Sequence, residues 1–78
     1  MTGKKIAELM GVLVRKHRKR AELTQAELAR YAGIGKTAVF DLEKGKATLR
    51  LSTLLAILPV LNLKLDLKGP FGNLHEEG

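Results

Sequence analysis

The chain has 78 residues, roughly half of an average domain, so it forms one small module with no room for a separate substrate domain. It has no cysteine, which excludes a disulfide framework and thiolate metal sites and favours a cytoplasmic protein. No apolar run approaches the length needed to span a bilayer, so no membrane partner is expected. The net charge of +6 is uneven: residues 1–50 carry twelve lysines and arginines against five acidic residues, whereas residues 51–78 carry two against three. Such one-sided positive charge is typical of proteins that bind polyanions.

Two helical patterns occupy the first third of the chain. In the first, Lys16, Lys19 and Arg20 fall on the solvent side, and five residues at helical spacing are expected to face inward: Ile6, Leu9, Met10, Leu13 and His17. Thr24 is a good N-cap, and Glu27 three residues later completes a capping box, so a second helix begins there. Gly33 supplies the left-handed residue that ends it.

Two more helical patterns follow. Residues 36–45 predict a third helix with Val39 and Leu42 facing inward, Ala38 alongside, and Gly45 at its end. A fourth is marked by Leu51, Leu54, Leu55, Leu58 and Leu61. Pro59 lies inside this pattern and predicts a kink or an early end, and Asn62 can take the positive φ needed to leave the helix.

Residues 63–68 alternate strictly, which predicts a strand with Leu63, Leu65 and Leu67 on one face. No other segment of the chain has a strand pattern, so the same strand of a second copy is the expected partner, paired antiparallel about a two-fold axis. The alternative is that these leucines extend along the helices of the same chain. Gly69-Pro70 then predicts a turn, which divides the chain into a domain at 1–68 and a flexible tail at 69–78.

Two short helices separated by Gly33-Ile34-Gly35 have the layout of a helix-turn-helix. In such a motif the second helix enters the major groove of DNA and presents side chains from its N-terminal end to the base edges. These side chains are Lys36, Thr37 and Phe40, with Gly35 leaving the backbone exposed at the helix start.

The expected phosphate contacts surround this helix. The N-terminus of the second helix offers free N–H groups at Gln25 and Ala26 beside Thr24. Lys44, Lys46 and Arg50 can contact the flanking DNA backbone.

Three spaced motifs resemble the Xre/Cro helix-turn-helix family of repressors: residues 23–29, 32–34 and 42–46. Residues 51–55 and the strand at 63–68 are more narrowly similar to the HipB-type antitoxins, whose dimers close through a C-terminal strand. The resemblance implies an all-α fold: a four- to five-helix, lambda-repressor-like domain with one C-terminal β-strand pairing across a homodimer. It also implies an ion pair between Arg18 and Glu43 and a phosphate contact by Gln25.

Three residues depart from the family pattern. Glu22 stands where the family usually has glycine, which predicts a strained or differently shaped first turn. Phe40 is bulkier than the usual polar residue, which disfavours a base hydrogen bond there. Pro59 interrupts a helix that is normally continuous.

The function expected from these features is a sequence-specific, homodimeric repressor that binds a palindromic operator in double-stranded DNA. The narrower resemblance implies the antitoxin of a HipA-like kinase toxin, which would regulate its own operon and bind that toxin. The alternatives are a stand-alone or phage-type regulator of the same family, and an interaction adaptor that has lost specific DNA recognition. The scattered carboxylates and the single Ser52 suggest no nucleophile–base pair, so neither catalysis nor a metal or cofactor is expected.

Overall fold

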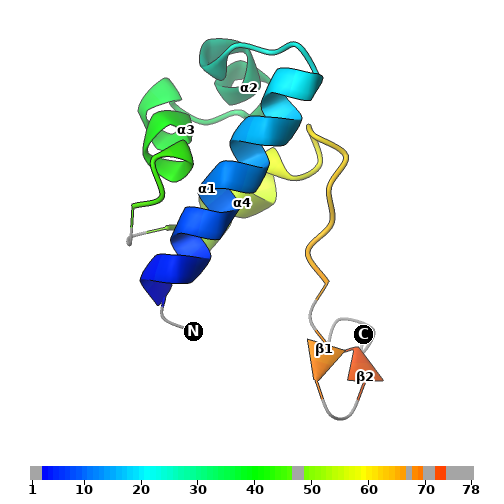
Figure 1. The fold of residues 1–78 in the computed structure, drawn as a ribbon. Coiled ribbons are helices and arrows are strands. Elements are labelled where there is room, and N and C mark those ends of the chain that lie inside the picture. Colours follow the sequence, from blue (N-terminus) through cyan, green and yellow to red (C-terminus); the bar gives the residue numbers. More distant parts are fainter. Residues whose placement is uncertain (1–2, 47–48, 67, 70–71, 74–78) are drawn as a thin grey trace.

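A computed structural model describes residues 3–46, 49–66, 68–69 and 72–73. In these ranges the chain forms four helices: α1 (Gly3–Arg20), α2 (Gln25–Ala32), α3 (Lys36–Glu43) and α4 (Leu51–Ile57). They are followed by two short strands, β1 (Lys68–Gly69) and β2 (Gly72–Asn73). Figure 1 shows the long α1 lying across the other three helices, with the strands set apart from them at the end of an extended segment.

The core lies where the four helices meet. Leu28 of α2, Val39 of α3 and Ile57 of α4 have no exposed surface, and α1 contributes Val14. Leu58 and Leu61, in the turn after α4, close the same cluster. Burying side chains from every helix in one cluster fixes α2 and α3 against each other, and this pair carries the candidate site.

The ends of α2 follow the local signals in the sequence. Thr24 Oγ1 accepts a hydrogen bond from the Glu27 N–H, and the Glu27 carboxylate accepts one from the Thr24 N–H, so the predicted capping box is present. The hydrogen bond from the Thr24 backbone lowers the pKa of the Glu27 carboxyl, which favours its charged form. Gly33 ends α2 with a φ of 72°, as predicted, and its N–H bonds the carbonyl groups of Ala29 and Arg30.

Other predicted chain breaks are also confirmed. Helix α4 ends at Ile57, two residues before Pro59, and Asn62 leaves the following turn with a φ of 58°. Glu22 has a φ of 60° at the end of α1, a conformation that is strained for a residue with a side chain. The N–H groups of Glu22 and Leu23 nevertheless bond back to Lys19 and Arg18, which closes the helix end.

The prediction of the inward face of α1 was wrong for three of its five residues. The helix buries Ala7, Gly11, Val14 and Arg18, one residue out of phase with the expected stripe. Met10 and His17 are half-buried, and the other three are largely exposed: Ile6, Leu9 and Leu13.

The physical reason is the close approach of α1 to the end of α3. A Cβ built on Gly11 would lie 2.5 Å from the Leu42 carbonyl oxygen, so only a residue without a side chain fits there. The small residues therefore face the core, and the larger apolar ones lie beside it. Leu51 and Leu55 of α4 are also exposed.

The C-terminal strand also differs from the prediction. Leu63 to Asp66 carry no strand, and Leu67 lies outside the described residues. Lys68 and Gly69 form β1, which pairs antiparallel with β2 in the same chain, in the register Lys68 with Asn73 and Gly69 with Gly72. A strand needs a partner for its backbone hydrogen bonds, and among the described residues β2 provides one for Lys68 and Gly69. The expectation that no other segment would pair was therefore incorrect. Residues 70, 71 and 74–78 lie outside the described part of the chain.

Candidate nucleic-acid interface

The turn between α2 and α3 sets the geometry of the site. Only Gly33, Ile34 and Gly35 separate the two helices, and the Ile34 N–H bonds the Ala29 carbonyl at 3.0 Å. Ile34 packs against the core, and Val39 and Leu42 of α3 are buried as predicted. Helix α3 is thus held through one face, and its opposite face is left to solvent.

That opposite face, which we call the outer face of α3, carries most of the predicted base-reading residues. It comprises Lys36, Thr37, Phe40, Asp41 and Lys44, all exposed except the partly exposed Asp41. The Lys44 ammonium lies 5.4 Å from the centroid of the Phe40 ring, a cation–π contact between side chains one turn apart. Gly35, at the N-cap, is exposed, and a Cβ added there would meet nothing within 4 Å.

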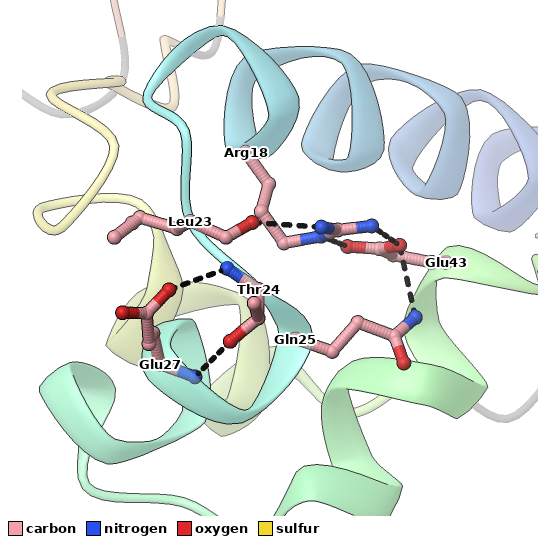
Figure 2. Close-up of polar contacts among 6 residues, drawn as sticks. All are labelled: Arg18, Leu23, Thr24, Gln25, Glu27 and Glu43. Carbon is pink, nitrogen blue, oxygen red and sulfur yellow. Dashed lines mark hydrogen bonds and ion pairs between the residues drawn. The ribbon is translucent and has the colours of Figure 1, made fainter.

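A polar network ties α1, α2 and α3 together beside the outer face. Figure 2 shows Arg18, Gln25 and Glu43 converging from the three helices. Arg18 Nε lies 2.6 Å from Glu43 Oε2 and Arg18 Nη2 lies 3.0 Å from Glu43 Oε1, a bidentate pair of the kind that the resemblance implies. The pair is almost buried, with side-chain exposures of 10% and 4%.

Two further hydrogen bonds complete this network. Arg18 Nη1 donates to the Leu23 carbonyl at 2.8 Å, which fixes the turn between α1 and α2. Gln25 Nε2 donates to Glu43 Oε1 at 3.1 Å. The hydrogen bond with Glu43 is the main cause that raises the pKa of the Arg18 guanidinium, which favours its charged form.

Some hydrogen-bonding groups of the predicted phosphate residues Thr24, Gln25 and Ala26 are already used within the protein. The Gln25 amide is oriented by Glu43, and an amide nitrogen has a second hydrogen to donate. Thr24 uses its hydroxyl and its N–H in the capping box. Within the described residues no contact uses the backbone N–H of Gln25 or Ala26, which keeps both available at this helix N-terminus.

The remaining predicted phosphate residues flank α3 at its other end. Lys46 Nζ lies 3.1 Å from Asp41 Oδ1, and both side chains are well exposed. Lys46 and Arg50 border one hollow of about 310 Å³ between α3 and the start of α4, together with Ala38, Asp41, Leu42, Leu49 and Thr53. Lys44 directly follows α3 in the chain. Together with Lys46 and Arg50 it places three basic residues just beyond the C-terminal end of that helix.

The sequence prediction missed two features of this site. Asp41 lies one turn after Thr37 on the outer face, and the spacing of four residues is the signal that could have found it. The hydrogen bond from Gln25 to Glu43 joins residues 18 positions apart, and no local pattern announces it.

Two other kinds of site were sought in the described ranges. There, no three His, Asp or Glu side chains gather as they would around a metal ion. None of the helices in the described ranges combines the length and apolar character needed to cross a membrane.

Comparison with known proteins agrees with this geometry. The helix-turn-helix family model matches residues 14–68, which include all of α2 and α3 and the buried ion pair. The chain belongs to the Xre-type helix-turn-helix family. A relative from Sinorhizobium fredii (strain NBRC 101917 / NGR234), described as the uncharacterized HTH-type transcriptional regulator y4mF, is 41% identical over 61 residues, which cover 78% of this chain and 80% of the relative.

Two solved structures share the fold of this helix-turn-helix protein. One is a chain of the HipA-HipB-O2-O3 complex, with a TM-score of 0.68 and 26% identity, and the match covers 90% of this chain and 93% of that one. The other, described as MDT Protein, has the same TM-score, identity and coverage. The likeness extends over nearly the whole of both chains, so it includes the segment after α4 as well as the helix-turn-helix.

Proposed function

We propose that this protein is a homodimeric, sequence-specific transcriptional repressor that binds a palindromic operator in double-stranded DNA. The observation that carries the proposal is the outer face of α3, which is exposed while its opposite face is locked in the core. An α-helix held in this way can enter the major groove. Lys36 then donates to guanine, Thr37 bonds or touches a thymine, and Phe40 packs on a thymine methyl group. Gly35 lets the backbone approach the DNA.

The phosphate contacts follow from the same orientation. Thr24, Gln25 and Ala26 lie at the N-terminus of α2, and three basic residues lie beyond the other end of α3: Lys44, Lys46 and Arg50. Contacts on both sides of α3 fix the helix in the groove, because phosphate contacts position a protein on the duplex. The family relationship and the excess of positive charge in residues 1–50 support this role.

An uncovered apolar groove supports the homodimer. Helix α1 and the segment after α4 enclose a groove of about 130 Å³, lined mainly by apolar residues that include Leu13, Leu63 and Leu65. Ile6 and Leu9 continue the exposed apolar surface along α1. Exposing this apolar surface to water is unfavourable in a monomer. We propose that a second copy covers it through Leu63, Leu65 and Leu67.

The narrower role we propose is that of an antitoxin, with no catalytic activity of its own. Its support is the likeness to a chain of the HipA-HipB-O2-O3 complex, at 26% identity over nearly the full chain. The partner would be a HipA-like kinase toxin. Expression of the neighbouring reading frame alone should then arrest growth, and coexpression with this chain should relieve the arrest. An absence of arrest would favour a regulator without a toxin.

Base reading by α3 is tested by selecting binding sites from random duplex DNA. The natural chain should enrich an inverted repeat. Lys36→Ala and Thr37→Ala should each lose about 1–3 kcal/mol of discrimination at one base pair per half-site, because each removes a base contact. Lys16→Ala is the matched control for Lys36→Ala, because it removes the same charge from the exposed face of α1. Its preferred sequence should be unchanged. If both α3 variants keep the natural preference, α3 does not read the operator. If the natural chain enriches no site, an adaptor function is favoured.

The dimer interface is tested by Leu65→Asp, whose side chain lines the apolar groove. Two buried charges in the shared layer should dissociate the dimer at micromolar concentration and weaken operator binding together with it. Val12→Asp is the control, because Val12 is more exposed than Leu65 and lies outside the groove. Sedimentation velocity measures the outcome. An intact Leu65→Asp dimer would remove this segment from the interface.

A further inference from the structure

Asp41 is a carboxylate on a face that is otherwise positively charged or neutral. It lies four residues after Thr37 and three before Lys44, so the three side chains share one face of α3. Its neighbours on that face are the residues proposed to meet DNA. A negative charge here would be repelled by the phosphates, so its presence needs an explanation.

Fold stability does not supply that explanation. The partner of Asp41 is Lys46, at 3.1 Å, and the side chains are 38% and 57% exposed, respectively. Ion pairs as exposed as this one contribute little to stability. The nearly buried pair of Arg18 and Glu43 already ties α3 to the rest of the domain.

We propose that Asp41 determines operator specificity by accepting a hydrogen bond from the N4 amino group of a cytosine in the major groove. The inference rests on the proposed function, since it requires that α3 lies in that groove. An ionised carboxylate only accepts hydrogen bonds, and cytosine N4 is the donor that Asp and Glu side chains characteristically read. Guanine offers only acceptors in the same groove and is therefore rejected.

Lys46 is the positioning residue for this contact. An ammonium group has three donors, so one hydrogen can remain on Asp41 while the others reach a phosphate. The ion pair holds the carboxylate in place and offsets its repulsion by the DNA backbone. This arrangement keeps the phosphate contact proposed for Lys46 and gives the lysine a second role.

The test compares the sites selected from random duplex DNA by the natural chain, Asp41→Asn and Asp41→Ala. The natural chain should prefer cytosine at one position of each half-site by about 5- to 150-fold over other bases. Asp41→Ala should lose that preference. Asp41→Asn should change it to adenine, because asparagine pairs with adenine N6 and N7. Circular dichroism should show that all three proteins fold alike, since the Asp41 side chain is partly exposed.

Thr37→Ala, selected in parallel, separates failure of this inference from failure of the proposed function. If Thr37→Ala alters the preferred sequence and neither Asp41 variant does, Asp41 is not a specificity residue, and α3 remains the reading helix. If Asp41→Ala only strengthens binding to all sequences equally, the carboxylate is a repulsive group and the inference is wrong. If none of the variants changes the sequence, or the natural chain enriches no site, both proposals fail.

Discussion

A Gly11→Ala variant is expected to lose about 3 kcal/mol of unfolding free energy, which is a large share of the stability of a domain this small. Alanine normally stabilises a helix interior relative to glycine by about 1 kcal/mol, so the predicted sign is the opposite of the intrinsic preference. The added Cβ would lie 2.5 Å from the Leu42 carbonyl oxygen and 2.9 Å from that of Glu43. Both are backbone atoms, so α1 and α3 would have to separate. Urea denaturation followed by circular dichroism measures the loss.

Gly35→Ala is the control for this variant. A Cβ at Gly35 meets nothing within 4 Å, and its φ of −75° suits any residue, so the stability should change by less than about 0.5 kcal/mol. The same variant should weaken operator binding if the DNA backbone approaches at that position. A Gly11→Ala protein as stable as the natural chain would mean that α1 and α3 do not cross as closely as described.

Glu43→Gln should be comparably damaging, with a loss of about 3 kcal/mol. The substitution keeps the size of the side chain but leaves the nearly buried Arg18 guanidinium without its counter-charge. The amide has one acceptor oxygen in place of two, so it cannot accept both hydrogen bonds of the bidentate pair and that of Gln25 with the same geometry. We expect lower stability at every salt concentration, because a buried pair is screened weakly.

Lys46→Gln provides the matched control, because it removes the exposed ion pair with Asp41. Its stability should fall by less than about 1 kcal/mol, and the difference should shrink in high salt. The double variant Arg18→Met with Glu43→Met should recover part of the loss seen in Glu43→Gln, since no charge is then left unpaired. If Glu43→Gln and Lys46→Gln lost equal amounts of unfolding free energy, the network of Arg18 and Glu43 would not be what holds α1, α2 and α3 together.

The features that could be predicted from the sequence are those with local causes. The capping box of Thr24 and Glu27, the end of α2 at Gly33 and the break near Pro59 each depend on a few adjacent residues. These features depend on short-range hydrogen bonds and backbone sterics, which can be inferred from residues that are close together in the sequence. The positions of α2 and α3, and hence most of the outer face of α3, follow from these signals.

The features that could not be predicted depend on what approaches from elsewhere. Hydrophobicity favours Ile6 and Leu9 as the inward residues of α1, but the close contact with α3 selects the smaller Ala7 and Gly11. The alternation from Leu63 to Leu67 indicates an extended segment and does not say which chain, if any, pairs with it. A helical stripe that is apolar but exposed in the single chain is what an interface between copies would leave.

Dimethyl sulfate footprinting tests most directly whether two copies of α3 lie in successive major grooves of one DNA site. This reagent methylates guanine N7 in the major groove, so a bound helix protects it. On a site selected from random duplexes, we expect two protected clusters related by two-fold symmetry and centred about one helical turn, 10–10.5 base pairs, apart. Both clusters should disappear together with Leu65→Asp. A single cluster, or binding that leaves every guanine N7 of the site reactive, would contradict the placement of two α3 helices in successive major grooves.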